Sequence, residues 1–295
     1  MTVLLIGANG QLGWALRRSL APLGPLTALT REQLDLSDAA AVHRCVLALK
    51  PRVVVNAAAY TAVDRAEQEP ALAHAVNAQA PEAMADAAAQ LGALLVHYST
   101  DYVFRGDGES ARSEDAATGP RNVYGHSKLA GETAVRASGA RHLLLRTSWV
   151  YAARGQNFPR TMLRLAQERE QLRVVADQIG APTGADLIAD VTAHAIRAVE
   201  RDAADLGTYH LVAAGETSWH GLASFVIEQA RALRPDLPWK TRSIEPIASI
   251  DYPTPAQRPL NSRLDGSRLA TAFGLQLPDW RDGVRHMLSD CLGTP

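Results

Sequence analysis

The sequence has few cysteines, almost no net charge and no long apolar run, and each shortage excludes a class of protein. Cys45 and Cys291 are its two cysteines among 295 residues, and they stand far apart. Two isolated thiols form neither a disulfide framework nor the paired spacing of a zinc site, which fits a reducing compartment. The formal net charge is -1, so nothing indicates nucleic acid or an acidic membrane as a partner.

The apolar run at the start, in MTVLLIGANG, has no basic flank and breaks at Gly7. It is too short for the core of a signal peptide, and far shorter than the roughly 20 residues that cross a bilayer. We therefore expect a cytoplasmic protein. The hydrophobic share of 47% and the charged share of 21% are those of a soluble globule with a sizeable core. A chain of this length suits one large or two modest domains.

Short apolar runs alternate with longer helical stretches through the first half of the chain. The strand candidates are TVLLIG, PLTALT, RVVVNAA, ALLVHYST and HLLLRTSWV. Such alternation predicts an α/β fold with a doubly wound parallel sheet, the Rossmann architecture, and helices on both faces.

After Tyr151 the pattern is less regular. A helix (NFPRTMLRLAQERE), a strand (LRVVAD) and another helix (ADLIADVTAHAIRAVE) precede a tail in which YPTPAQRPLNSRLD reads as an extended linker. We assign residues 1–150 and about 180–213 to an NAD(P)-binding Rossmann domain. Residues from about 151 to 179 and from 214 to 295 are assigned to a smaller α/β substrate-binding domain over the carboxyl edge of the sheet.

A glycine-rich loop, G-x-x-G-x-x-G, lies between the first strand and the first helix. Glycine allows a tight turn and a close approach of the backbone to a ligand, and the helix amino terminus offers N–H groups to a pyrophosphate. Glycines also serve simple turns, but the strand before and the helix after this loop favour a dinucleotide site. The cofactor-binding residues predicted in this loop and at the following strand ends are Gly7, Asn9, Gly10, Gln11, Leu12, Gly13, Arg31, Asp35, Leu36, Ala57, Ala58, Ala59, Tyr60 and Thr61.

The end of the second strand bears on the choice of cofactor. Arg31 stands where the adenosine ribose is expected, and an arginine can pair with the 2′-phosphate of NADPH. Glu32 is adjacent, and a shift of one residue in the turn would bring its carboxylate to the ribose instead. We predict that NADPH is preferred and that NADH is also accepted.

Tyr124 and Lys128 lie four residues apart in VYGHSKLAGE, and therefore on one side of a predicted helix. A Tyr-x-x-x-Lys match is common by chance. Thr100, at the end of the strand ALLVHYST, is by itself best interpreted as a cap. Together the three side chains can surround a carbonyl oxygen, with Thr100 donating a hydrogen bond and Tyr124 supplying a proton. A free phenol has a pKa of about 10, and we expect the ammonium of Lys128 to lower it.

These residues together resemble the extended short-chain dehydrogenases/reductases. The motifs STDYVF, NVYGHSKLAGE, RTSWVYA, DQIGAPTGADLIAD and RPLNSRLD resemble in particular those members that reduce 4-keto nucleotide sugars, and the match runs to LPDWRDGV near the carboxyl end. The resemblance implies NAD(P)H-dependent reduction of the C4 ketone of dTDP-4-dehydro-6-deoxy-L-mannose to dTDP-L-rhamnose, the last step of dTDP-L-rhamnose synthesis. It makes the smaller domain the binder of the sugar nucleotide.

The resemblance also implies roles for single residues. Tyr124 is the proton donor, assisted by Lys128 and Thr100, and both Tyr124 and Lys128 also contact the cofactor. Thr100, Asp101, Tyr102 and Trp149 bind the sugar. A tryptophan at a strand end suits a flat apolar wall, although a buried core position is the competing interpretation. Arg258 is a candidate partner for the pyrophosphate, with a plain surface arginine as the alternative.

Relatives of this kind have been described with a magnesium-bridged dimer that uses a glutamate in the first helix. Ala15 stands at that position here, while Asp186 and Asp290 occupy the other two. We therefore predict no metal, and a homodimer remains a possible assembly.

Two rival functions remain open. One is a nucleotide-sugar epimerase or 4,6-dehydratase on the same fold. A dehydratase has Asp-Glu after the threonine, whereas Thr100 is followed by Asp101 and Tyr102. The other rival is a non-catalytic regulatory subunit, against which the intact Thr100, Tyr124 and Lys128 weigh.

Overall fold

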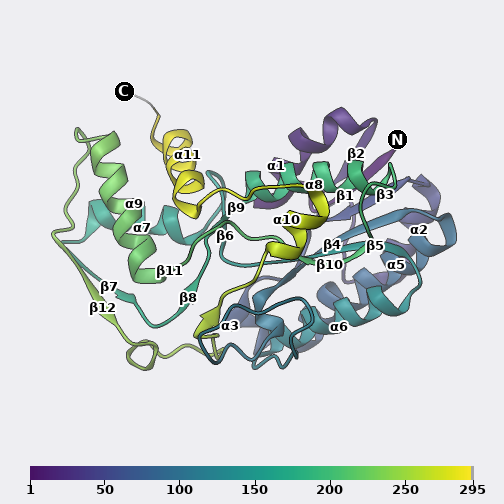
Figure 1. Ribbon diagram of the computed structural model, residues 1–295. Coiled ribbons are helices and arrows are strands. Elements are labelled where there is room, and N and C mark those ends of the chain that lie inside the picture. Colours follow the sequence, from purple (N-terminus) through teal and green to yellow (C-terminus); the bar gives the residue numbers. More distant parts are fainter. Residues whose placement is uncertain (294–295) are drawn as a thin grey trace.

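Six parallel strands form the central sheet of the larger of two lobes in the computed structural model, which describes residues 1–293 (Figure 1). Their order is β10-β5-β4-β3-β1-β2, and every neighbouring pair is parallel. The strands are β1 (Val3–Ile6), β2 (Leu26–Leu29), β3 (Val53–Asn56), β4 (Leu94–Thr100), β5 (Arg141–Thr147) and β10 (Gly207–His210). The doubly wound fold predicted from the sequence is confirmed, with β10 as a strand that was not foreseen.

The inner strands are buried on both faces, which explains their continuous apolar runs. Every residue of β1, β3 and β4 is buried. Successive side chains alternate between the faces: Leu5 packs beneath one layer of helices, and Leu4 and Ile6 pack beneath the other. The strand order reverses between β1 and β3, so the glycine loop after β1 and the alanines after β3 face each other at the switch point where ligands bind such sheets.

Helices cover both faces of this sheet. One layer consists of α1 (Gln11–Leu20) and α8 (Ala185–Val199), and the other of α2 (Ala39–Leu49), α5 (Ala80–Leu91) and α6 (Val123–Ala137). Short helices α3 (Val63–Ala66) and α4 (Pro70–His74) precede α5. Helix α10 (Ser267–Phe273) also packs on the sheet, with Leu269 and Phe273 in the core beneath α8, although the sequence placed it in the smaller domain.

The smaller lobe has its own core. It contains α7 (Phe158–Glu168), α9 (Trp219–Leu233) and α11 (Trp280–Leu292), together with the parallel pair β7 (Gln171–Val175) and β12 (Ser243–Ile247). Short strands link the lobes: β6 (Val150–Tyr151) pairs with β9 (Thr183–Gly184), and β8 (Ile179–Gly180) pairs with β11 (Thr217–Ser218) and β13 (Asn261–Ser262). The tail therefore contains the helices α9 and α11 besides the linker-like run.

The stretch EPALAHAVNAQAPEAMADAAAQ does not form one regular helix. A π-helical segment, Ala75–Gln79, separates α4 from α5, whose first turn holds Pro81. Proline lacks the N–H of a regular helical hydrogen bond, and π segments often occur at functional sites. Asn77 projects from this segment and is 1% exposed.

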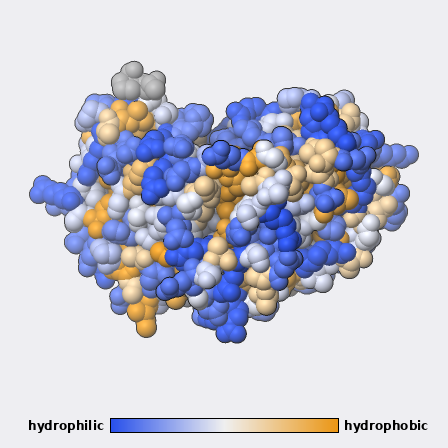
Figure 2. Space-filling view, in the orientation of Figure 1, coloured by the Kyte–Doolittle hydropathy of each residue, from blue (hydrophilic) through white to orange (hydrophobic). Residues whose placement is uncertain are grey.

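Polar residues cover most of the face shown in Figure 2, and the apolar groups on it are small and separate. The outline is indented between the two lobes. Across residues 1–293, no helix combines the length and apolar character that crossing a membrane requires.

Candidate active site

A cleft of about 670 Å³ lies at the carboxyl ends of β1, β3, β4 and β5 and extends to the smaller lobe. It brings together nearly every residue that the sequence singled out. Those on its wall are Gly7, Asn9, Gly10, Gln11, Leu12, Arg31, Asp35, Leu36, Ala57, Ala58, Ala59, Tyr60, Thr61, Thr100, Asp101, Tyr102, Tyr124, Lys128 and Trp149.

Two glycines of the loop owe their identity to close contacts. Gly7 has a φ of 85°, and a Cβ there would lie 2.7 Å from the backbone nitrogen of Ala58. A Cβ on Gly13 would lie 2.0 Å from the carbonyl oxygen of Gly7. Gly13 is buried inside α1 and does not line the cleft. It packs behind the loop, so any effect of this predicted cofactor residue is indirect.

The loop is shaped to receive an anion. Gly10 is the N-cap of α1, and no side chain of the described residues caps this helix. The first N–H groups of α1 are therefore available to a phosphate at the positive end of the helix. Arg31 and Glu32 are both exposed after β2 and both line the cleft. The structure therefore leaves both residues where one could contact the 2′-phosphate and the other the ribose.

Helix α6 presents Tyr124 and Lys128 from its first two turns. Asn122 caps the helix, accepting a hydrogen bond from the Gly125 N–H at 2.7 Å. The Lys128 ammonium donates to the Tyr98 carbonyl oxygen at 2.6 Å, and its Nζ lies 3.4 Å from Nε2 of His97. Burial lowers the pKa of Lys128 to about 8.

The expected lowering of the Tyr124 pKa is wrong for the protein without a bound cofactor. Burial raises the pKa of Tyr124 to about 12, and a hydrogen bond with Thr100 offsets this only in part. The charge of nearby Asp101 raises the pKa of Tyr124 further, while the ammonium of Lys128 is directed to the Tyr98 carbonyl oxygen. A phenol with so high a pKa stays protonated at neutral pH, as a proton donor must.

Thr100 caps a single turn of helix, Asp101–Val103, at the end of β4. Its Oγ1 accepts a hydrogen bond from the Tyr102 N–H at 3.2 Å and donates to Oδ1 of Asp101 at 3.1 Å. The rings of Tyr102 and Tyr124 meet edge to face, 5.4 Å apart. Burial raises the pKa of Asp101 to about 6. The three residues of Thr100–Tyr102 thus form one hydrogen-bonded corner beside Tyr124.

Trp149 is a wall of the cleft and not a core residue. It is partly exposed, has a φ of 49° and stacks on Trp219 with ring centroids 3.7 Å apart. A Cβ on Gly180 would lie 2.9 Å from Cε2 of Trp149, so only glycine lets the indole lie there. A left-handed backbone at a bulky residue is held against strain by its surroundings, a feature that clusters at functional sites.

Several features of the cleft fit a dinucleotide and a polar sugar. Gly7 leaves no room for a side chain beside Ala58, and the uncapped start of α1 lines the cleft. Oδ2 of Asp101 and Oγ1 of Thr147 are buried polar atoms without a hydrogen-bond partner in residues 1–293. Both residues line the cleft, and such atoms need a partner from a ligand or water.

Arg258 does not project freely toward a phosphate. Its guanidinium forms two hydrogen bonds with the carboxylate of Asp64 in α3, at 2.7 and 3.1 Å. Asn122 donates to the carbonyl oxygen of Gln257 at 2.7 Å. These contacts fasten the linker-like segment to the start of α6, so Arg258 orders the rim of the cleft.

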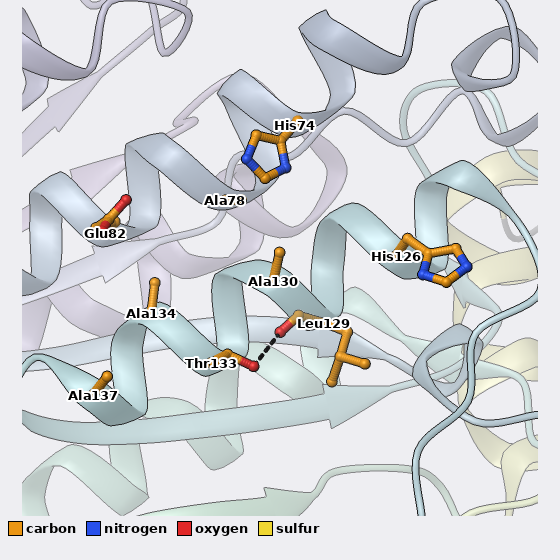
Figure 3. A pocket seen from close by; sticks show the side chains of 9 residues that line it. All are labelled: His74, Ala78, Glu82, His126, Leu129, Ala130, Thr133, Ala134 and Ala137. Carbon is orange, nitrogen blue, oxygen red and sulfur yellow. Dashed lines mark hydrogen bonds between the residues drawn. The ribbon is translucent and has the colours of Figure 1, made fainter.

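A second hollow lies on the outer surface between α6 and the α4–α5 side (Figure 3). Its lining includes four alanines, with His74, Glu82 and His126 spread around it. None of the predicted site residues lies there. The predicted site residues therefore gather in the larger cleft.

Comparison with known proteins identifies the family. The model of the RmlD substrate binding domain matches residues 1–292. A dTDP-4-dehydrorhamnose reductase of Shigella flexneri is 50% identical over all of this chain and 99% of its own length. The chain belongs to the dTDP-4-dehydrorhamnose reductase family. The resemblance inferred from the sequence motifs is confirmed.

Solved members of this reductase family share the fold. A dTDP-4-dehydrorhamnose reductase of Clostridium acetobutylicum superimposes with a TM-score of 0.90 at 32% identity, over 98% of this chain and 99% of its own. The reductase of Bacillus anthracis, solved in complex with NADP, gives a TM-score of 0.87 at 35% identity, over 97% of this chain and 98% of its own.

Sequence reasoning missed several residues at the reductase-like cleft. Trp219 lines it and stacks on Trp149, while Ser148 and Leu72 are further wall residues. The stretch TSWHG carried only the signal of a helix start, with Ser218 as the cap just before Trp219. Ser148 stands beside Trp149 in the motif RTSWVYA and could have been predicted with it, whereas Leu72 had no distinctive sequence context.

The structure does not test the prediction that no metal is bound at Ala15, Asp186 and Asp290. Ala15 is buried in α1, Asp186 lies in the first turn of α8, and Asp290 lies in α11. The described part of the chain contains no cluster of three metal-binding side chains. The absence of a metal remains a prediction.

Proposed function

We propose that this chain reduces the C4 ketone of dTDP-4-dehydro-6-deoxy-L-mannose with NADPH, giving dTDP-L-rhamnose. One observation carries the proposal: in a member of the dTDP-4-dehydrorhamnose reductase family, Thr100, Tyr124 and Lys128 line the cleft that also holds the glycine loop. A proton donor, a hydrogen-bond donor and a cation thus stand where a carbonyl can be reduced.

Different residues of the cleft would bind the two ends of the cofactor. The backbone of the loop from Gly7 to Leu12 would hold the pyrophosphate, and Lys128 would hold the nicotinamide end. When bound, NADPH supplies a hydride to the C4 carbon. Every other contribution comes from the side chains around the sugar.

Tyr124 gives its phenolic proton to the C4 oxygen as negative charge develops there. Its raised pKa keeps that proton in place until substrate is bound. Thr100 turns its hydroxyl from Asp101 to the same oxygen, and Asp101 and Tyr102 orient the sugar hydroxyls. The paired indoles of Trp149 and Trp219 cover an apolar side of the deoxysugar and exclude water from the reacting centre.

The choice of NADPH over NADH rests on Arg31. Its side chain is exposed on the cleft wall, where it can pair with a 2′-phosphate. The neighbouring Glu32 accepts a hydrogen bond from the Thr30 side chain, which lowers the pKa of its carboxyl. A carboxylate that is already occupied competes less for the ribose, so we expect NADPH to be preferred and NADH to be used more slowly.

The rival functions have weaker support. A 4,6-dehydratase needs a second carboxyl after Asp101, and Tyr102 stands at that position on the cleft. A regulatory subunit has no need of the hydrogen-bonded corner at Thr100. A homodimer and the absence of a nucleic-acid partner remain predictions.

Purified protein mixed with NADPH and the dTDP-linked 4-keto sugar tests the proposal. Loss of NADPH absorbance with formation of dTDP-L-rhamnose supports it, and Tyr124→Phe serves as the matched control. No turnover with an intact fold would favour a regulatory subunit. Conversion of a dTDP-hexose without added cofactor would favour the dehydratase or epimerase.

A further inference from the structure

Two buried polar residues behind Lys128 have no part in the mechanism described above. His97 lies on β4 and Asn56 at the end of β3, and each is 1% exposed. Nδ2 of Asn56 lies 3.1 Å from Nδ1 of His97, and Nε2 of His97 lies 3.4 Å from Nζ of Lys128. The two side chains therefore connect the cofactor-binding backbone near Ala58 to the lysine of the active site.

The backbone fixes the orientation of the Asn56 amide. The N–H of Ala58 donates to the other end of this amide, at 3.1 Å. Only an oxygen can accept that bond, so the atom facing His97 is the NH₂ group, a donor. The opposite orientation would place two donors against each other at Ala58 and leave a buried N–H unpaired.

The orientation of Asn56 in turn fixes the tautomer of His97. Nδ1 must accept the hydrogen bond from Asn56, so the ring proton lies on Nε2. The ring stays neutral, because burial lowers the pKa of His97 well below its usual value and the nearby Lys128 lowers it further. The Nε2–H bond then points at Nζ of Lys128. An ammonium cannot accept this hydrogen bond, whereas a neutral amine has a lone pair for it.

We propose that Asn56 and His97 are positioning residues that present an N–H donor to Lys128 and so favour its neutral amine. That Lys128 acts in turnover rests on the proposed function, whereas the hydrogen-bond polarity around it does not. A lysine held in this way changes its charge near neutral pH and can both release and accept a proton. Lys128 can thereby hold or release a proton within the same cleft as Tyr124.

Other charged groups near Lys128 do not reverse this arrangement. Glu132, one turn further along α6, favours the charged lysine, but it is paired with Arg146 on β5 at 2.7 Å. From the single turn after β4, Asp101 has a raised pKa of its own. Tyr124 and Tyr98 remain protonated. Burial outweighs Glu132, because the pKa of Lys128 falls to about 8.

Nuclear magnetic resonance can read both side chains in the wild-type protein without substrate. The sequence has three lysines, and Lys50 and Lys240 are exposed, so ¹³C-labelled lysine gives a spectrum with two internal references. Long-range ¹H–¹⁵N spectra distinguish the histidine tautomers, and His97→Gln assigns the His97 signals. We expect His97 with its proton on Nε2 and a Lys128 titration near pH 8. A proton on Nδ1, or a doubly protonated ring, would overturn the proposal.

Asn56→Asp reverses the direction of the hydrogen bond between residue 56 and Nδ1 of His97. A carboxylate still accepts from Ala58, but it also accepts from Nδ1–H of His97, which leaves Nε2 as an acceptor for an ammonium. We expect the Lys128 titration to move up by about one pH unit or more, and the alkaline limb of the kcat profile to move with it.

Asn77→Asp is the matched control for added charge. Asn77 is equally buried and donates to Ser127, the neighbour of Lys128, at 3.0 Å, but it makes no contact with His97. It should leave the tautomer unchanged and move Lys128 less. If Asn56→Asp leaves the Lys128 titration in place, or both variants shift it equally, the tautomer does not control the lysine. If the protein has no reductase activity, the spectra still decide the question, so failure of the proposed function is seen separately.

Discussion

Asp101 is a carboxyl whose ionised form destabilises the fold, and Asp101→Asn measures the cost. The residue is 3% exposed, its Oδ2 has no hydrogen-bond partner in residues 1–293, and its Oδ1 accepts one hydrogen bond from Thr100. Burial raises its pKa from 3.8 to about 6. The charged form is therefore disfavoured in the folded state.

The size and the sign of the effect follow from that shift. A difference of about two pKa units, at about 1.4 kcal/mol each, means that ionised Asp101 destabilises the fold by about 3 kcal/mol. Because the folded-state pKa is the higher one, this cost is absent below about pH 4, grows between about pH 4 and pH 6, and is complete at neutral pH. The asparagine amide brings an unpaired N–H that offsets about 1 to 2 kcal/mol. A net gain of about 1 to 2 kcal/mol remains at neutral pH.

Thermal unfolding of both proteins across that pH range is the assay. For a chain of this size 1 kcal/mol corresponds to about 2 °C, so the variant should melt about 2 to 4 °C higher at neutral pH. It should have no advantage at about pH 4. Asp86→Asn, on the exposed face of α5, is the matched control and should show no such trend. A difference in Tm that is independent of pH, or a variant that is less stable at neutral pH, would refute the reasoning.

Four further predictions concern turnover and binding. Tyr124→Phe should lower kcat by about 10²-fold or more with cofactor affinity almost unchanged, and near-normal turnover would remove Tyr124 from the mechanism. Gly7→Ala should weaken NADPH binding at least about tenfold in a fluorescence titration, because strain and a clash with Ala58 combine; Gly92→Ala, strained but in open space, should bind normally, and equal loss would show that the clash is irrelevant. Arg31→Ala should raise KM for NADPH and leave KM for NADH nearly unchanged, whereas equal loss would mean a structural role. Tyr102→Phe should raise KM for the sugar alone, and an effect confined to the cofactor would misplace that loop.

The parts of the fold that depend on local sequence were predictable. Strands β1 and β3 consist almost entirely of apolar residues because both faces of the sheet are covered there. The glycine loop could be predicted because a strand, a turn and a helix follow one another in the sequence around Gly7. The spacing of Tyr124 and Lys128 placed both on one side of α6, and both line the cleft.

What depends on long-range contacts was not predictable. Strand β10 is four residues long and joins the sheet beside β5 from a distant part of the chain. Helix α9 was not predicted, although its apolar spacing and its Ser218 cap are local signals of a helix. The burial of Tyr124 arises only when α6 packs against the end of β4, and it was therefore missed, so the pKa of Tyr124 was predicted in the wrong direction.

Transfer of deuterium tests the central claim most directly. NADPH carrying deuterium at the transferable position of its nicotinamide is incubated with the protein and the dTDP-linked 4-keto sugar, and the product is examined by proton and deuterium NMR. The account predicts one deuterium at C4 of dTDP-L-rhamnose, and loss of at least about 10²-fold of that signal in Tyr124→Phe at equal times. Deuterium at another carbon, or product formed without deuterium, would contradict it.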